Sequence, residues 1–291
     1  MKLLKIYKDS TRMKESGKGA LLLVIAFLIF GSFGIAAKYI QASPLMLLYG
    51  MQAAGLIVLF VILMKEKNFS TKGMLKGIAI MTFFALVTDF SFFAAVKLMN
   101  VSNVVFIRFT APVLILIFAP FIIKEKVERK SLLAIPIALL GLFLILYQGK
   151  LVFDSDATGI IYSLITAVSL ALFIIFVKQV SQKVKVNVLL FYRYLIGVIV
   201  LTPLVMLEQP SVSYELIAVL MVFGVIFGYV ASVIHQEGVK KSKTQTSGIL
   251  MYIEPLSAAV YGIFVLSEIP TIFTIAGAAL IIASTYFALK N

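Results

Sequence analysis

The sequence predicts an all-α integral membrane protein whose ten transmembrane helices form two inverted five-helix repeats. Three observations predict this fold: the composition, the number of long apolar segments, and the distribution of basic residues between them. Of the 291 residues, 62% are hydrophobic and 13% are charged, whereas soluble domains are about half apolar and about a quarter charged. Too little polar surface remains to cover a soluble fold of this size, so the solvent is mainly lipid.

Ten segments approach the length of about 20 mainly apolar residues that a spanning helix requires. Each is expected to be helical, because lipid offers no partners to an unpaired backbone. The first is too long for the core of a typical signal peptide and has no convincing cleavage site, so we interpret it as a retained helix. The third is the least apolar. The segments are 19–40, 43–64, 74–97, 101–123, 131–148, 157–179, 186–207, 213–237, 244–266 and 270–289.

Basic residues define the expected orientation. The formal net charge is +13, and most of the 26 lysines and arginines lie in the N-terminal segment and in every second connection. Positively charged loops remain in the cytoplasm, so both termini are expected to be cytoplasmic, with the protein in the plasma membrane. This distribution explains the basic charge without a nucleic-acid partner.

Unusual residues recur between the two halves of the chain. Pro112 precedes Glu125 by the same interval as Pro255 precedes Glu268, and the two prolines are 143 positions apart. Five spans per half is an odd number, so the second half enters the membrane from the opposite side, a frequent plan of secondary transporters. The expected organisation is a cytoplasmic segment (1–18), a first repeat (19–148), a linker (149–156) and a second repeat (157–291).

Several stretches also resemble a known family. "SEIPTIFTIAGAALIIAS" (267–284) is similar to the glutamate-then-glycine signature of the EamA group of the drug/metabolite transporter superfamily, and "FYRYLIG" (191–197) resembles its arginine-bearing segment. The first half keeps Glu125 but has Ala134 where the glycine would fall. The resemblance implies a ten-helix transporter and is unspecific about the substrate, because such families carry amino acids, sugars, nucleotide-linked metabolites and drugs.

Charged residues inside the spans are the candidate substrate-binding residues. Asp89, Arg108 and Glu254 interrupt apolar runs, and an ionisable residue at membrane depth is expensive and usually functional. An arginine there can bind a carboxylate through two donors, and an acid can hold an amine or a proton. The alternative is an internal salt bridge that only fixes helix packing. Phe109 and Tyr252 flank these positions and either line the cavity or pack between helices.

Pro112 and Pro255 remove a backbone donor inside a predicted helix. We expect each to kink its helix and to serve as a gating hinge, although an ordinary packing kink is the alternative. Glu125 and Glu268 precede predicted helices and are expected to cap them. Arg193 is expected to extend to the cytoplasmic interface or to satisfy backbone carbonyls. His235 is expected to lie at a solvated helix end, with a proton relay as its alternative role.

These features predict a secondary transporter that moves a small polar metabolite, an amino acid or a related carboxylate-bearing compound, by alternating access. We expect no cofactor and no metal, because the sequence has no cysteine, no phosphate-binding loop and no metal-ligand motif. The expected partners are the substrate, membrane lipid and a coupling ion such as a proton. A drug or nucleotide-sugar carrier of the same fold is the main alternative, and a membrane-embedded enzyme is another. Substrate, direction and oligomeric state remain open.

Overall fold

The computed structural model describes residues 2–99, 101–147, 156–208, 213–267 and 269–289. Within these ranges every regular element is a helix. Nine helical segments of this described part are long and apolar enough to cross a membrane, and the apolar part of α1, Gly17–Gly31, is shorter. The prediction of an all-helical, multi-pass membrane fold is confirmed. Most of the expected linker, 149–156, lies outside the described residues.

The helices follow the predicted segments closely. Where the chain leaves the expected linker, the carboxylate of Asp156 accepts a hydrogen bond of 2.7 Å from the Gly159 amide and caps α8. The elements in chain order are α1 (Lys2–Gly31), α2 (Phe33–Tyr39), α3 (Pro44–Glu66), α4 (Leu75–Leu98), α5 (Val101–Arg108), α6 (Ala111–Ile122), α7 (Arg129–Leu146), α8 (Ala157–Ser181), α9 (Val186–Leu207), α10 (Tyr214–Phe223), the π-helix η1 (Gly224–Ala231), α11 (Ser232–Lys241), α12 (Thr244–Leu250), α13 (Ile253–Leu266) and α14 (Ile272–Leu289).

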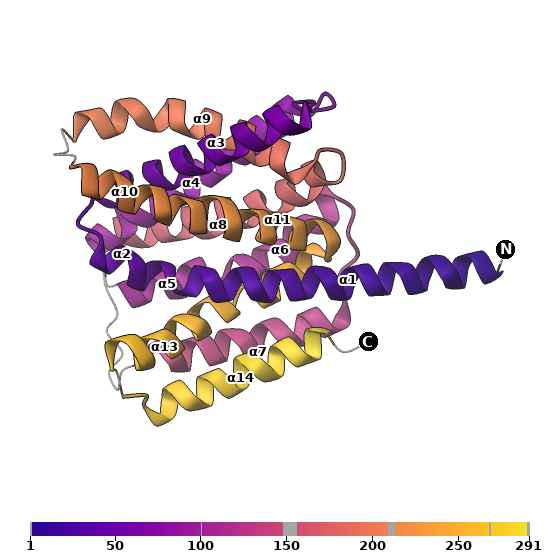
Figure 1. Cartoon of the computed structure of the whole chain (residues 1–291). Helices are drawn as coiled ribbons and strands as arrows, with labels where there is room; N and C mark the ends of the chain where they lie inside the picture. The colour runs from indigo at the N-terminus through magenta and orange to yellow at the C-terminus, as the bar shows by residue number, and fades with distance from the viewer. Residues whose placement is uncertain (1, 100, 148–155, 209–212, 268, 290–291) are drawn as a thin grey trace.

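The helices form one bundle with a common long direction (Figure 1). Helices α3 and α9 pack together along one edge of the bundle, and α7 and α14 pack along the opposite edge. Between these edges α8 packs against α4, and α1 packs against α11 and α13. The N-terminal part of α1 projects beyond the bundle at the same end at which α14 finishes (Figure 1).

Two predicted spans are broken rather than kinked. The segment 101–123 is divided between α5 and α6, and the segment 244–266 between α12 and α13. In each case the proline occupies the first turn of the following helix, Pro112 in α6 and Pro255 in α13. A proline is tolerated there because its missing N–H would have no partner in the helix. The prolines therefore mark where a second helix begins within each span.

A third break, between α1 and α2, has no proline. It falls at Gly31–Ser32, where the Ser32 hydroxyl donates to the Ile29 carbonyl at 2.7 Å. A Cβ atom at Gly31 would lie 1.8 Å from the Ser257 hydroxyl of α13, so only glycine fits this approach. Glycine–serine pairs are a recognised cause of helix kinks, which explains why the expected span 19–40 is interrupted.

Close helix contacts depend on small residues. A Cβ atom at Gly224 would lie 2.4 Å from the Ala54 side chain, and one at Gly228 would lie 2.1 Å from the Met51 carbonyl. These glycines belong to η1 and allow its backbone to reach that of α3. In lipid, where the hydrophobic effect does not drive helices together, such close packing is a main source of association.

Candidate functional site

Arg108 and Glu254 form an ion pair between the two halves of the chain. An Nη1 atom of Arg108 lies 3.4 Å from Oε1 of Glu254, and the two side chains are 23% and 22% exposed. Arg108 ends α5 and Glu254 lies in the first turn of α13. Each charge therefore occupies the helix end whose dipole favours it. The structure brings together one predicted residue from each half of the chain.

Phe109 and Tyr252 lie at the two breaks and contact each other. The Tyr252 hydroxyl donates a hydrogen bond of 2.8 Å to the Phe109 carbonyl, and the ring centroids are 5.8 Å apart. That carbonyl is available because the Val113 amide donates to Thr110, at 2.9 Å, instead of continuing the α-helical pattern. Both side chains are buried. Tyr252 thus satisfies a backbone group that the break in the first span has released.

The Arg108 guanidinium is also held by aromatic faces. It lies 5.3 Å from the ring centroid of Phe92 and 5.4 Å from that of Phe109. Asp89, the third predicted charged residue, lies on α4 and is partly exposed. It does not form the ion pair with Arg108. Its carboxylate interacts electrostatically with two arginines, more strongly with Arg193 than with Arg108.

The expectation for Arg193 was wrong. Its guanidinium turns into the bundle, 4.8 Å from the ring centroid of Phe173 and 5.4 Å from that of Tyr194. The positive charge of Arg193 interacts electrostatically with Asp89 and with His235. An arginine inside an apolar run is the signal that identifies this residue, but the direction of its side chain depends on which helices surround α9.

His235 is not at a solvated helix end, because α11 continues to Lys241. The imidazole is buried and packs edge-on against Phe27 at 5.3 Å and Phe30 at 5.8 Å between ring centroids. The next residue, Gln236, is also buried, and neither polar atom of its side chain has a hydrogen-bond partner among the described residues. Sequence reasoning missed both as interior groups.

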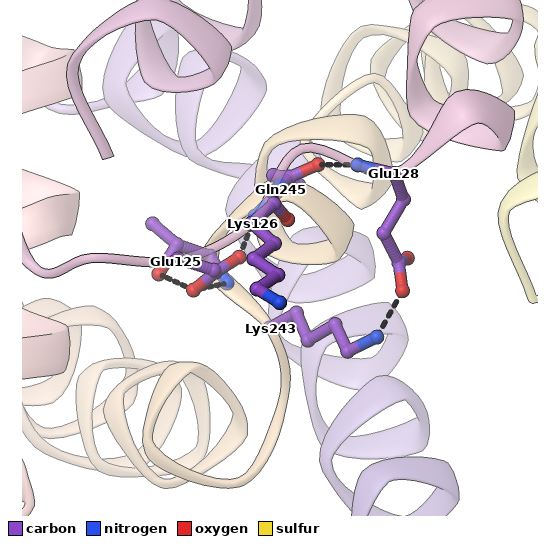
Figure 2. Close-up of polar contacts among 6 residues, drawn as sticks. Glu125, Lys126, Glu128, Lys243 and Gln245 are labelled. Carbon is purple, nitrogen blue, oxygen red and sulfur yellow. Dashed lines mark hydrogen bonds and ion pairs between the residues drawn. The ribbon is translucent and has the colours of Figure 1, made fainter. Parts of the chain in front are cut away.

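At one end of the bundle Glu125 caps a helix in the other half of the chain, and not the helix that follows it (Figure 2). Its carboxylate accepts hydrogen bonds from the Thr244 amide at 3.1 Å, the Thr244 hydroxyl at 2.8 Å and the Gln245 amide at 3.3 Å. These donors form the first turn of α12, where a negative charge is favoured. The expected cap on the following helix is therefore wrong for Glu125, and Glu268 lies outside the described residues.

The same loop makes three further contacts at the start of α12. The Gln245 side chain accepts from the Glu128 amide at 3.0 Å and donates to the Lys126 carbonyl at 2.7 Å, while Lys243 pairs with the Glu128 carboxylate (Figure 2). We call this set the clasp. It consists of Glu125, Lys126, Glu128, Lys243, Thr244 and Gln245.

Among the described residues, no three histidine, cysteine, aspartate or glutamate side chains gather as metal ligands. A surface groove of about 330 Å³ lies between α4 and α8. Its lining is almost entirely apolar, including Val87 and Leu164, and it contains none of the candidate residues. Such a surface is typical of a lipid-facing helix pair.

A bundle of membrane-length helices with partly buried charges between them is typical of a multi-pass membrane protein with a polar path through it. The chain belongs to the EamA-like transporter family, whose model matches residues 17–147 and again residues 157–290. The resemblance to this family is thereby confirmed, and the chain is a transporter.

Several relatives carry transporter names. The chain is 26% identical to an uncharacterized transporter of Archaeoglobus fulgidus over 274 residues, which cover 94% of this chain and 97% of that protein. It is 25% identical to the S-adenosylmethionine uptake transporter of Rickettsia prowazekii over 191 residues, or 66% of this chain and 64% of that protein. A solved crystal structure aligns with a TM-score of 0.82 and 18% identity, covering 94% of this chain and 96% of the other. That likeness shows the fold alone.

Proposed function

We propose that this transporter moves a small polar metabolite bearing a carboxylate, an amino acid or a related compound, across the plasma membrane by alternating access. The observation that carries the proposal is the Arg108–Glu254 pair. It joins the two halves of the chain at the points where each half has a broken span. A charge pair at membrane depth is expensive, and a substrate with complementary charges can replace either partner.

The proposed architecture is a pair of inverted repeats related by the 143-residue offset. Helices α7 and α14 are equivalent under this offset and pack against each other. Their contacts also come in equivalent pairs: the Ser284 hydroxyl donates to the Ala134 carbonyl at 2.7 Å, and Gly277 closely approaches Gly141. Shifting both members of the first contact by 143 positions produces the second.

Paired contacts of this kind are expected at a two-fold axis, where residue i meets j and j meets i. Phe109 and Tyr252 are also equivalent, and they touch directly, which supports an axis passing between the two breaks. The equivalent helices α3 and α9 pack at the other edge of the bundle. The twofold match of the family model supports the same organisation.

Ten spans and cytoplasmic termini complete the proposed topology. The apolar part of α1 and the short helix α2 together form the first span in this proposal. An even number of spans places both termini on the same side of the membrane. In agreement with this, α1 projects from the end of the bundle at which α14 finishes (Figure 1). The clasp and its lysines lie in connections that the basic residues assign to the cytoplasm.

In this proposal the clasp closes the cytoplasmic end of the path. It ties the connection after α6, in the first repeat, to the start of α12, in the second. Alternating access then requires the clasp to open, while the breaks at Pro112 and Pro255 absorb the change in helix direction. Energy comes from a substrate or ion gradient, and a proton carried by Glu254 is one proposed coupling.

The substrate class rests on the charges of the site. Arg108 suits a carboxylate, while Glu254 suits an ammonium group or a proton. One relative is named for the uptake of S-adenosylmethionine, a molecule with an α-amino acid head group. This relationship supports an amino acid or one of its derivatives as the substrate.

Counterflow into liposomes containing the purified protein tests the proposal. The panel should include the common amino acids, S-adenosylmethionine, simple carboxylates, nucleotide sugars and cationic drugs. We expect saturable exchange that requires a carboxylate. Exchange confined to compounds without a carboxylate would make the protein a carrier of another substrate class, and a covalently altered product would indicate an enzyme.

A further inference from the structure

A second charged pair lies inside the bundle, and its members do not touch. Asp89 lies on α4 and Arg193 on α9, two helices that pack against each other. Their charges are near enough to influence each other, but among the described residues they form no ion pair within 4.0 Å. Neither side chain forms a hydrogen bond or an ion pair with the described part of the chain. Both residues are partly exposed, although they lie on helices within the bundle.

Charges left open at membrane depth require another partner. An unsatisfied ionised group in hydrocarbon costs several kcal/mol. The Arg193 guanidinium lies against the faces of Phe173 and Tyr194. Stacking of this kind leaves the donors at the guanidinium edge free for a planar acceptor such as a carboxylate.

One of the two rings against which Arg193 lies is itself anchored. The Tyr194 hydroxyl hydrogen bonds to the Gly228 carbonyl at 2.5 Å and to the Ser232 hydroxyl at 2.9 Å. The aromatic face beside Arg193 is therefore anchored to η1 and α11. A preorganised side chain of this kind loses little conformational entropy when it binds a ligand.

Two adjacent residues of α11, His235 and Gln236, carry buried polar groups without hydrogen-bond partners among the described residues. His235 interacts electrostatically with Arg193 and makes only ring contacts within the described residues. Gln236 keeps both amide atoms buried and without a partner. Buried polar groups are usually hydrogen bonded, so unmet groups on the helix turn that carries His235 agree with a site that a ligand completes.

We propose that Asp89 and Arg193 bind the α-amino-carboxylate head group of the substrate, with the ammonium group on Asp89 and the carboxylate on Arg193. A zwitterion satisfies both open charges at once, which a simple anion or a simple cation does not. This inference rests on the proposed function and adds a second binding position to it.

The two arginines then mark successive positions along the transport path. Arg108 is seven residues from the start of α5, and Arg193 is seven residues from the start of α9, which is about 10 Å in each case. In the proposed topology these helices begin at opposite faces of the membrane. Asp89 interacts with both arginines, so an ammonium group held there allows the carboxylate to pass from one to the other.

The test compares selectivity rather than activity alone. Wild type, Arg193→Gln, Asp89→Asn and the neutral double variant are purified in detergent, with the exposed Arg129→Gln as a matched control. The amino acid that best stabilises the wild type is identified from the common amino acids and S-adenosylmethionine. Binding of this compound, its amide and its deamino analogue is then measured by thermal shift and by counterflow.

We expect Arg193→Gln to bind the amino acid at least about tenfold more weakly and to lose the preference for the acid over the amide. Asp89→Asn should lose the preference for the amino acid over its deamino analogue. Arg129→Gln should behave like the wild type. If Arg193→Gln does not fold, Arg193→Lys retains the charge without the planar fork and is expected to weaken carboxylate binding by a similar factor.

The possible failures are distinguishable. Wild-type selectivity in both single variants, or in the double variant, would overturn the Asp89–Arg193 site and leave the proposed function intact. A wild-type protein that exchanges other compounds but no amino acid would instead refute the proposed function, and this inference with it.

Discussion

Arg108 and Arg193 have similar surroundings and different partners. Each guanidinium lies over the aromatic residue that follows it in the chain and over a second ring from a neighbouring helix. Arg108 is joined to Glu254 at 3.4 Å, whereas Arg193 forms no ion pair with Asp89 among the described residues. The same stacking therefore supports a closed pair at one position and an open pair at the other.

The difference follows from the helices that carry the residues. Arg108 and Glu254 lie at helix ends created by the two breaks, so movement at the breaks changes their separation. Asp89 and Arg193 lie inside the unbroken helices α4 and α9, which pack against each other. Binding groups are positioned best on rigid elements, and switching contacts belong at hinges. We infer that the closed pair changes with conformation as well as with the substrate, while the open pair offers the substrate a binding position of fixed geometry.

The largest expected effect separates the two acids by stability. Glu254→Gln leaves Arg108 without its partner and should lower the free energy of unfolding by roughly 2 kcal/mol, less than for a fully buried pair because both side chains are partly exposed. Asp89→Asn breaks no contact with the described residues and should change it by less than about 0.5 kcal/mol. Thermal unfolding in detergent without substrate measures both.

The double variant Arg108→Gln/Glu254→Gln is the control for this comparison. It removes both charges and should regain most of the lost stability. Equal destabilisation by Glu254→Gln and Asp89→Asn would remove the distinction between a closed and an open pair. Full recovery of transport in the double variant would show that Arg108 and Glu254 form a structural salt bridge only.

A smaller effect on stability is expected at the clasp. Its two glutamates are three positions apart, and one makes several hydrogen bonds while the other makes a single exposed ion pair. Glu125→Ala removes the acceptor for the first amides of α12 and should cost about 1.5 kcal/mol. Glu128→Ala loses only an exposed ion pair with Lys243 and should cost about 0.5 kcal/mol or less. Because the chain has no cysteine, a cysteine introduced at the buried Thr246 reports opening by its rate of maleimide labelling.

Faster labelling is expected with Glu125→Ala than with Glu128→Ala. Similar rates in both variants would mean that the cap on α12 does not keep this end of the bundle closed.

The positions of the disturbances at Pro112 and Pro255 were predictable from the sequence because proline acts locally, through its missing donor and its ring, although kinks were predicted where the structure has breaks. The break at Gly31–Ser32 carries a weaker local signal, a glycine–serine pair without a proline. The close approach of α13 that requires glycine at position 31 is contained in no local pattern. The same limit explains Glu125. Its capping role was foreseen, but the helix that it caps lies 119 positions further along the chain.

The charged residues of the site could be identified from the sequence because charges are costly in lipid. Which of them pair with each other could not be predicted. Arg108, Glu254 and Asp89 stand out in apolar runs, but Arg193 was placed at the interface and His235 at a solvated end. In a membrane bundle apolar side chains face both lipid and protein, so the hydrophobic pattern does not reveal which side of a helix faces the interior. Only the packing of α9 against α4 and of α11 against α1 determines where these side chains point.

The smallest effect concerns the contact that joins the two breaks beside the closed pair. Tyr252→Phe keeps the ring packing with Phe109 but removes the hydroxyl that donates to the Phe109 carbonyl. An unmatched buried carbonyl should lower the free energy of unfolding by about 1 kcal/mol and slow exchange, because the two broken spans no longer share a fixed contact. Tyr261→Phe, in the helix α13 that Tyr252 precedes, is the matched control, since the Tyr261 hydroxyl has no hydrogen bond to the described residues. Thermal unfolding and counterflow of both variants measure the difference. If Tyr252→Phe behaves like Tyr261→Phe, the breaks are independent of each other, and the closed pair alone would couple the two halves.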